Sequence, residues 1–391
     1  MNVILFDTEE DHKNLQPLTL TRPVSDIRCG ILTLREKWAK HTNVAGVLAQ
    51  DYLHPLFAPV TSGNAFLYVR SSVVASKELL NELQKLKDNE LLVDGKEWIG
   101  FKSNHAVRSC NEIGNKPKGL TNKQTKNKVS FVHHLWDIFV MNGECIKNDF
   151  KLLTAGKKTV RLSSTNRVIG KKNQVFLEKG AIAEACIFNT NDGPVYIGKK
   201  AEVMEGTLIR GPFALGEEST LKMGAKIYGA TTIGPHCKVG GEVSNSVIFG
   251  YSNKAHDGFL GNSVIGEWCN LGADTNNSNL KNNYGNVKIT DIRTKSTIDT
   301  NRQFCGVFMG DHSKTGINTM LNTGTVIGVS ANIFGGDFPP KLVPSFSWGG
   351  ANGFEKFDFT KALEVAKRVK ERRGLSVEPG EEKILKYIFG L

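Results

Sequence analysis

The stretch IGKKAEVMEGTLIRGPFALGEESTLKMGAKIYGATTIGPHCKVG, residues 197–240, decides the fold of this chain. Counted in steps of six, eight successive positions in it are aliphatic: Ile197, Val203, Ile209, Leu215, Leu221, Ile227, Ile233 and Val239. An amphipathic helix would repeat about every 3.6 residues, and a half-buried strand every second residue. A spacing of six indicates short strands joined by turns, with one inward side chain per strand and three strands per coil. The stretch predicts a parallel β-helix of hexapeptide repeats.

The same spacing returns closer to the C-terminus. It is resumed at Met309, Thr315, Leu321, Ile327 and Ile333. The register is interrupted between Val239 and Met309. Because perfect repeats form a scaffold, we expect the chemistry of the protein in this interruption.

The first part of the chain has a different pattern. Short apolar runs at 3–6, 44–48 and 65–69 predict buried strands, and the patterns at 33–41 and 76–87 predict helices. This alternation is typical of a parallel α/β sheet. Further helices are predicted at 135–150, 358–373 and 380–389. We therefore expect an α/β domain over 1–158, the β-helix over 159–345 and a helical tail over 346–391.

Composition limits the function classes. The 391 residues include 50 Lys and Arg against 39 Asp and Glu, a formal charge of +11. The basic residues are spread out, apart from five lysines between Lys116 and Lys128, which we interpret as a solvated loop. This favours small anionic ligands over nucleic acid. The lack of a long apolar run, of a signal-like N-terminus and of paired cysteines predicts a cytoplasmic protein without membrane contact.

Two kinds of side chain stand out in the interruption. His256 lies beside Lys254 and Asp257, and seven asparagines lie between Asn270 and Asn286. A lone histidine is most often a surface-loop residue, and asparagines often serve only turn geometry. Their amides are also uncharged donors and acceptors for a sugar or an acyl oxygen.

The segment KAHDGFLGNSVIGEWCNLGADT, residues 254–275, resembles the K-A-G-H-x-x-Y-L-G-D-x-x-I-G-x-x-x-N-x-G-A-G-T block of a bifunctional family. These are the N-acetylglucosamine-1-phosphate uridyltransferase/glucosamine-1-phosphate acetyltransferases. Glu242 and Asn270 lie fourteen residues before and after His256, in step with the family. The segments 17–38 and 135–139 are similar to a shortened variant of it with a divergent N-terminal domain.

The resemblance implies a nucleotidyltransferase-like α/β domain followed by a left-handed β-helix and C-terminal helices. It also implies acetyl-CoA-dependent N-acetylation of glucosamine-1-phosphate. His256 is then the general base, with Glu242 and Asn270 as further catalytic residues. Lys222 and Lys254 are expected to bind the sugar phosphate. The segment SNLKNNYGN (278–286) replaces a family N-Y-D-G motif, and from it we expect Asn279, Lys281 and Tyr284 to bind substrate. Phe259 and Ser244 stand where the family has tyrosine and lysine.

The start of the chain departs further from the family. Uridyltransferases begin with a glycine-rich loop that holds the triphosphate, whereas residues 7–16 here read DTEEDHKNLQ. Arg22 and Arg28 are candidates to replace the missing basic residues at the nucleotide. Uridylyl transfer from UTP would also need Mg²⁺, for which the sequence assigns no ligand.

Three readings follow. The first is the acetyltransferase, with or without uridylyl transfer to give UDP-N-acetylglucosamine. The second is a monofunctional hexapeptide acyltransferase with another acceptor and a degenerate N-terminal domain. The third is a non-catalytic scaffold that binds sugar nucleotide. In the family, three coils pack in parallel with acyl-CoA between neighbours, so we expect a homotrimer.

Overall fold

The computed structural model describes residues 2–60, 66–107 and 109–391. Its contacts divide the chain into two compact units. The head unit comprises Met1–Ile27, Leu32–Leu135 and Val377–Leu391, and the coil unit comprises Arg28–Ile31 and Trp136–Ser376. This division differs from the predicted ranges because one helix before the coil groups with the coil, and the last helix groups with the head. The predicted architecture, an α/β part followed by a left-handed β-helix and C-terminal helices, is confirmed.

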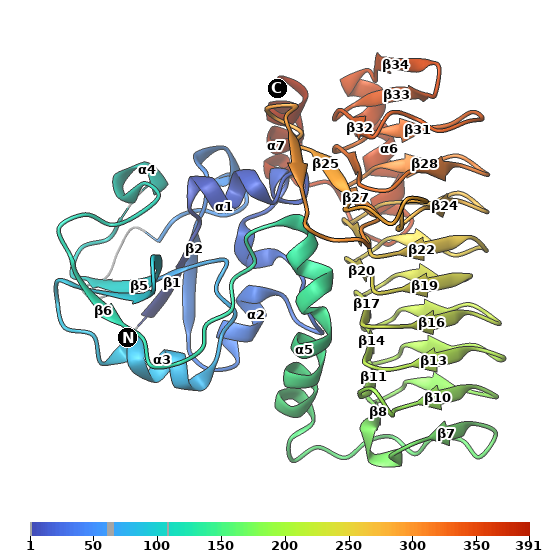
Figure 1. Ribbon diagram of the computed structural model, residues 1–391, viewed down its shortest axis with the longest axis horizontal. Helices are drawn as coiled ribbons and strands as arrows, with labels where there is room; N and C mark the ends of the chain where they lie inside the picture. Colours follow the sequence, from blue (N-terminus) through green and yellow to red (C-terminus); the bar gives the residue numbers. More distant parts are fainter. Residues whose placement is uncertain (1, 61–65, 108) are drawn as a thin grey trace. The chain divides into compact units, whose positions relative to one another are not determined.

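The head unit contains a mixed sheet of six strands (Figure 1). In spatial order they are β2 (Val44–Leu48), β1 (Asn2–Phe6), β3 (Phe66–Arg70), β5 (Glu97–Ser103), β4 (Glu90–Asp94) and β6 (Thr121–Gln124). β1 is parallel to β2 and β3, as predicted, but β5 is antiparallel to both β3 and β4. The prediction of a wholly parallel sheet is therefore wrong. The tight turn between β4 and β5, with Gly95 at φ 60°, reverses the chain direction and makes these two strands antiparallel. Ala65 of the predicted strand lies outside the described residues.

Short helices surround this sheet. They are α1 (Glu9–Asn14), α2 (Leu34–Ala39), α3 (Lys77–Gln84), α4 (Cys110–Ile113) and α7 (Pro379–Phe389), with 3-10 turns at Leu18–Leu20, Val24–Asp26 and Asp51–Leu53. α3 begins where predicted, since the Ser76 side chain accepts a hydrogen bond from the Leu79 amide. α7 packs on the head through stacked Tyr52 and Tyr387 rings, 4.2 Å apart.

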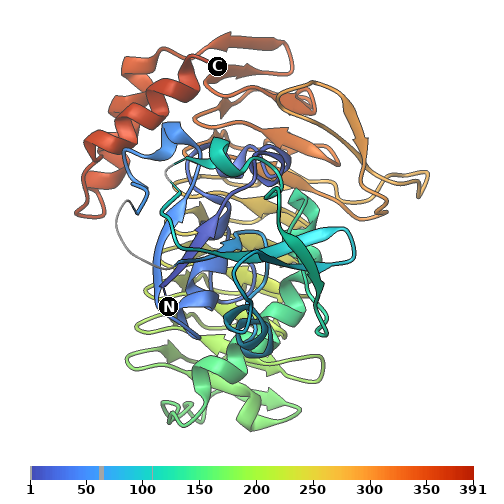
Figure 2. The same ribbon diagram turned by 90° about the vertical axis from the view of Figure 1, so that its left-hand side faces the viewer.

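The coil unit is a stack of turns with three faces, seen in chain order in both views (Figure 1, Figure 2). The first face holds β8 (Val175–Leu177), β11 (Val195–Ile197), β14 (Phe213–Leu215), β17 (Thr231–Ile233), β20 (Val247–Ile248), β23 (Val264–Ile265), β27 (Val307–Met309), β30 (Thr325–Ile327) and β32 (Leu342–Val343). The second holds β7 (Arg167–Ile169), β10 (Ile187–Asn189), β13 (Leu208–Arg210), β16 (Lys226–Tyr228), β19 (Glu242–Ser244) and β22 (Phe259–Gly261), with β24 (Asn276–Asn277) and β29 (Met320–Leu321) beyond. The third holds β9 (Ile182–Ala183), β12 (Glu202–Val203), β15 (Thr220–Leu221), β18 (Lys238–Val239) and β21 (Asn253–Lys254), and later β28 (Lys314–Thr315), β31 (Asn332–Ile333), β33 (Ser347–Gly350) and β34 (Gly353–Lys356).

The interruption in the sequence period does not interrupt the coil. Ile248 and Ile265 continue the inward column above Ile233, at intervals of fifteen and seventeen residues. The next partner in the ladder is Met309, so the chain makes a single long excursion in this region. The excursion carries the hairpin β25 (Lys288–Thr290) and β26 (Thr297–Asp299). Shorter turns shift the period while the same faces stay paired.

Two helices lie on the coil. α5 (Leu135–Thr154) covers the first face, where Phe139 stacks on Phe308 and Phe150 meets Phe176 edge-on. α6 (Phe359–Glu371) lies beside the corner at which the first face turns into the third, where the Lys370 ammonium is 5.3 Å from the centre of the Trp268 ring. Within the described ranges, no helix combines the length and hydrophobicity that crossing a membrane requires.

Candidate functional site

The three predicted catalytic residues lie around one corner of the coil, where the third face turns into the second. We call it the site corner, residues 222–225, 240–241, 255–258 and 272–275 on successive turns. His256 is in the turn between β21 and β22 and is exposed. Glu242, on the strand paired with β22, lies one turn below. Asn270 bridges to Asn253, three residues before His256, and lies one turn above. The structure thus places Glu242, His256 and Asn270 on three successive turns of the coil.

The site corner is shortened just below His256. Two residues, Gly240 and Gly241, join β18 to β19, where four join β15 to β16 and β21 to β22. Gly241 has φ 72°, and a Cβ on it would lie 2.9 Å from the His256 carbonyl oxygen and 2.8 Å from that of Gly258. The turn of His256 therefore packs directly on the backbone of Gly241. A side chain at position 241 would clash with this turn.

Glu242 is part of a small polar group on the second face. Its carboxylate accepts a short hydrogen bond from the Tyr228 hydroxyl and lies 4.0 Å from the Lys226 ammonium. Burial and the adjacent carboxylate raise the pKa of Tyr228 to about 12. Tyr228 is therefore a neutral donor that orients Glu242 at physiological pH.

Lys254 has a structural place that the sequence did not predict. Its side chain fills an inward position next to Val239 and is 2% exposed. The ammonium donates to the carbonyl oxygens of His256 at 2.7 Å and Asp257 at 3.2 Å. Burial lowers its pKa to about 8. An ammonium used in this way holds the His256 turn and is not presented to a sugar phosphate, so the predicted phosphate contact has no support in the geometry.

The other predicted substrate residues divide between two corners. Lys222 belongs to the site corner, two turns below His256, next to Gly240. The remaining three are at the opposite end of the second face, in the excursion: Asn279 donates to Asn262 at 2.8 Å, the Lys281 ammonium donates to the Asn286 carbonyl at 3.3 Å, and Tyr284 is 67% exposed. They are not grouped with His256.

Two of the interruption's asparagines, Asn276 and Asn277, serve the coil itself. The Asn276 side chain accepts from the Phe259 amide at 2.8 Å, and that of Asn277 accepts from the Gly261 amide at 2.8 Å. Asn277 also fills a buried inward position. For these two residues, the interpretation as structural turn and ladder amides is the one that the contacts support.

The head unit has a buried charged cluster at the carboxyl ends of β1 and β3. Both oxygens of Asp11 are bound by the Arg70 guanidinium, at 2.6 and 2.8 Å. Ser72 donates to the same carboxylate at 2.8 Å, and a His133 ring nitrogen is 3.3 Å from it. Arg70 also makes a short ion pair with Glu97. Ligands of open α/β sheets bind at this edge, so the cluster lies where a nucleotide would be expected.

Two carboxylates of this edge have opposite pKa shifts. Burial would raise the pKa of Asp11, but the hydrogen bonds from His133 and Arg70 lower it to about 2. Asp7 is fully buried, and burial raises its pKa to about 7, although its carboxylate accepts from the Val24 amide at 2.8 Å. One carboxylate is thus permanently charged and paired, while the other is close to half protonated at neutral pH.

These donors do not fit Mg²⁺, the ion that uridylyl transfer would need. Mg²⁺ takes near-octahedral oxygen ligands and keeps several waters. The oxygens of Asp11 are already bound by Arg70 and Ser72, and Asp7 has no exposed surface. Among residues 2–60, 66–107 and 109–391, no group of three or more His, Cys, Asp or Glu side chains is arranged to hold a metal ion.

The two predicted nucleotide-binding arginines fall in different units. Arg22 belongs to the head, is 7% exposed and acts electrostatically on half-buried Asp26. Arg28 belongs to the coil unit and donates to the Ile31 carbonyl oxygen. α1, with Thr8 as its N-cap, directly follows β1 in place of a phosphate loop. Arg22 thus lies near Asp26, at the carboxyl edge of the sheet. The Arg28 guanidinium is hydrogen-bonded within its own loop.

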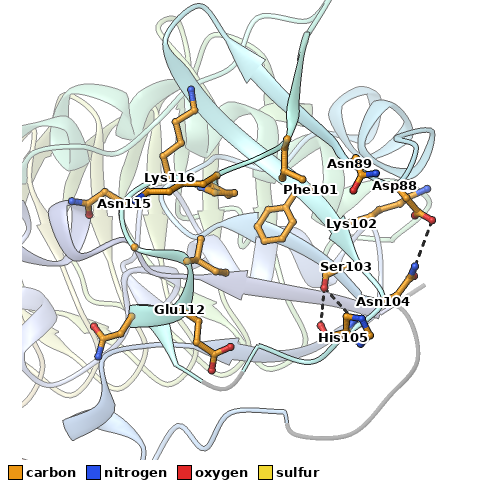
Figure 3. A pocket seen from close by; sticks show the side chains of 16 residues that line it. Asp88, Asn89, Phe101, Lys102, Ser103, Asn104, His105, Glu112, Asn115 and Lys116 are labelled. Carbon is orange, nitrogen blue, oxygen red and sulfur yellow. Dashed lines mark hydrogen bonds between the residues drawn. The ribbon is translucent and has the colours of Figure 1, made fainter.

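The head also contains an open pocket that the sequence did not predict (Figure 3). Its volume is about 820 Å³, and it is formed by the end of β5, by α4 and by the loop after α4. The Phe101 ring lies in it, with Lys116 on one side and Ser103 and His105 on the other (Figure 3). An aromatic ring with amide and ammonium groups at its rim suits a polar, ring-shaped anion such as a sugar phosphate.

Part of this pocket comes from the lysine-rich stretch that we interpreted as a solvated loop. Lys116 and Lys118 line the pocket, together with Asn115 and Pro117. The Asn115 side chain accepts from the Glu10 amide at 3.2 Å, and its carbonyl accepts from the Trp98 indole at 2.6 Å. The available signal was the position of these lysines close behind an aromatic strand, rather than their number.

A chain that combines a mixed α/β head with a hexapeptide coil belongs to the class of two-part proteins, and a family model matches its first part. Residues 3–158 match the model of the family described as sugar nucleotidyl transferase. The resemblance to bifunctional nucleotidyltransferase/acetyltransferases is confirmed for part of the chain.

Three curated relatives illustrate this likeness. The bifunctional sugar-1-phosphate nucleotidylyltransferase/acetyltransferase of Sulfurisphaera tokodaii is 36% identical over 146 residues, which is 37% of this chain and 36% of the relative. Bifunctional GlmU proteins of Trichodesmium erythraeum and Methanocaldococcus jannaschii are 28% and 37% identical over 150 and 87 residues, or 38% and 22% of this chain and 27% and 21% of theirs. The matches span about a third of the length of these relatives, or less.

Solved structures resemble the chain more distantly. An Arabidopsis UDP-N-acetylglucosamine acyltransferase is 16% identical, with a TM-score of 0.25, and covers 52% of this chain and 76% of its own. The polysialic-acid-specific acetyltransferase NeuO is 13% identical, with a TM-score of 0.29, and covers 54% of this chain and 94% of its own. We infer nothing about substrates from these likenesses.

Proposed function

We propose that this protein is an acetyl-CoA-dependent acetyltransferase that acylates the amine of an amino-sugar phosphate, with glucosamine-1-phosphate as the first candidate. One observation carries the proposal. An exposed imidazole, His256, stands at a corner of the coil with Glu242 and Asn270 on the turns directly below and above it. The names of the curated relatives, which include sugar-phosphate nucleotidyl- and acetyltransferase, support the same chemistry.

The reaction is an attack by the sugar amine on the thioester carbonyl of acetyl-CoA. A C–N bond forms, the C–S bond breaks, and CoA leaves as the thiol. His256 takes the proton that the amine loses and returns it to the departing sulfur. Glu242, oriented by Tyr228, supplies a negative charge next to the amine, and the amide of Asn270 supplies a neutral donor for the acyl oxygen.

We assign a second, separate site for a sugar phosphate or sugar nucleotide to the head, in the pocket that contains Phe101. The family match of residues 3–158 supports this assignment. A ring that stacks on Phe101 would present its phosphate to Lys102 or Lys116 at the rim. Uridylyl transfer is tested separately, by measuring the release of pyrophosphate from UTP.

We further propose that the protein works as a homotrimer in the cytoplasm. The first face of the coil is covered by α5, whereas the second face keeps apolar side chains in solvent. Ile187 and Leu208 are neighbours on β10 and β13 and are 37% and 46% exposed. Packing this face against another coil would remove both from water.

The test follows CoA release and pyrophosphate release separately, with glucosamine-1-phosphate, acetyl-CoA, UTP and Mg²⁺. We expect CoA release, and we expect His256→Asn to reduce it by about 10²- to 10⁴-fold, the contribution of a general base. His236→Asn is the matched control, because this coil histidine has φ 58°, which asparagine tolerates, and it stacks on Tyr251 at a different corner. No CoA release by the unmutated protein would favour the non-catalytic scaffold, and release with other amines or hydroxyls only would favour the alternative acceptor.

A further inference from the structure

We propose that Arg70 permanently occupies the place of a divalent cation in the head, so that the head binds its anionic ligand without metal and transfers no nucleotidyl group. This goes beyond the proposed acyl transfer, which belongs to the coil. The family that residues 3–158 match would imply Mg²⁺ at the carboxyl edge of the sheet. The side chains at this edge do not fit that ion.

The guanidinium is held on all sides. Its Nε and one NH₂ group bind the two oxygens of Asp11, and its other NH₂ group pairs with Glu97. Its carbon lies 5.6 Å from the centre of the Phe131 ring and 5.9 Å from that of Trp98, so that aromatic side chains enclose it. The Arg70 side chain is 5% exposed and that of Asp11 is 1% exposed. A buried, bidentate pair of this kind does not open for an incoming ion at low cost.

The groups around Arg70 are of the type that metals bind. Asp11 and Glu97 offer carboxylate oxygens, and ring nitrogens of His133 lie 3.3 Å from Asp11 and 4.0 Å from Glu97. Carboxylate and imidazole together suit Mn²⁺ and related ions. The positive charge that would compensate these carboxylates is already present as part of the chain, at the end of β3 and on the edge of the sheet where α/β proteins bind ligands.

The neighbouring carboxylates give no second cation site. Asp7 is fully buried and is bonded to the Val24 amide. Asp26 is paired with Arg35. The carboxylates of Asp7, Asp11 and Asp26 are thus each bonded to a group of the protein, and these three leave no second cation position beside Arg70.

The first experiment titrates the full-length, EDTA-treated protein with Mn²⁺ and follows free Mn²⁺ by electron paramagnetic resonance. We expect no site with a Kd below about 1 mM and no change in Tm on adding EDTA or Mg²⁺. One saturable Mn²⁺ per chain would overturn the proposal, as would Mg²⁺-dependent pyrophosphate release from UTP and a sugar phosphate. CoA release is read in parallel, so a failure here is distinct from a failure of the acetyltransferase.

The second experiment removes the internal cation. Arg70→Ala leaves Asp11, Glu97 and His133 around an open position, and we expect Tm to fall by about 5–15 °C and Mn²⁺ to restore part of it. Arg35→Ala is the control, because it exposes a single carboxylate, Asp26, and should gain no response to Mn²⁺. An Arg70→Ala protein that folds and ignores Mn²⁺ would refute the assignment. If it does not fold, the titration of the unmutated protein decides.

Discussion

Asp7 shows how one buried carboxylate links the head to pH. Its pKa is raised from 3.8 to about 7 by burial. Between these two values the folded state binds more protons than the unfolded state, so this residue makes the free energy of unfolding fall as pH rises from about 4 to 7. Above pH 7 the folded protein carries an unpaired buried charge, and the loss stays constant.

We predict that Asp7→Asn stabilises the head at pH 8 by up to about 4 kcal/mol and has little effect at pH 4. Asparagine keeps an oxygen for the Val24 amide and carries no charge. Urea unfolding of both proteins at pH 4, 6 and 8 measures this difference. Because His12 and the other groups titrate in both proteins, they cancel, and equal stability differences at all three pH values would contradict the pKa shift.

The Lys254 ammonium holds the turn of His256 through two backbone carbonyl oxygens. We predict that Lys254→Met lowers kcat for acetyl transfer by about tenfold with little change in KM, because the turn of His256 loses both hydrogen bonds to the ammonium. Lys314→Met is the control, since the Lys314 ammonium donates to the His312 carbonyl at another corner, at 2.8 Å. Equal losses in both variants would show only a general weakening of the coil.

At the scale of the element, the corner turns of the coil vary in length while its strands stay short and regular. Strands of two or three residues leave little freedom in the faces, and each turn can be lengthened or shortened without loss of pairing. The two-residue turn at Gly240 and Gly241, between two turns of four, is such a change. This short turn leaves the space in which the His256 turn packs on the glycine backbone.

Gly241 and Gly224 provide a matched pair for this idea. Both have positive φ at the site corner, 72° and 69°, but a Cβ at 224 meets nothing within 4 Å. We predict that Gly224→Ala costs only about 1 kcal/mol of backbone strain and keeps acetyl transfer. Gly241→Ala should also displace the His256 turn and reduce kcat at least tenfold. Thermal unfolding and CoA release check both, and equal activity in the two variants would remove the role of the shortened turn.

At the scale of the whole molecule, the second face of the coil is the surface left for contact with a second copy. α5 buries the first face, and α6 lies beside the corner of Trp268. The second face retains exposed apolar residues on successive turns, among them Ile187, Leu208 and Tyr228. Burial of such a row is the usual driving force for association.

We predict that Ile187→Lys combined with Leu208→Lys converts a trimer into monomers, because two neighbouring charges would then have to be buried between the coils. Sedimentation velocity at several concentrations measures the state, and Tm checks that the coil remains folded. Lys charges placed at Val140 and Leu152, exposed on α5, are the control and should leave the trimer intact. A monomeric unmutated protein would contradict the assembly.

The sequence by itself determined the coil, because an inward aliphatic residue every six positions is a local rule that each short strand obeys independently, and it determined helix starts such as Ser76, where the cap lies next to the helix that it serves. It also placed Glu242, His256 and Asn270 in step. Tertiary structure decided the rest: the inward direction of Lys254, the mixed order of the head sheet, the pocket at Lys116, and the pairing of Arg70 with Asp11, which lie 59 residues apart. These depend on which strands become neighbours, and since a buried charge takes whichever partner the packing brings to it, no local pattern records the choice.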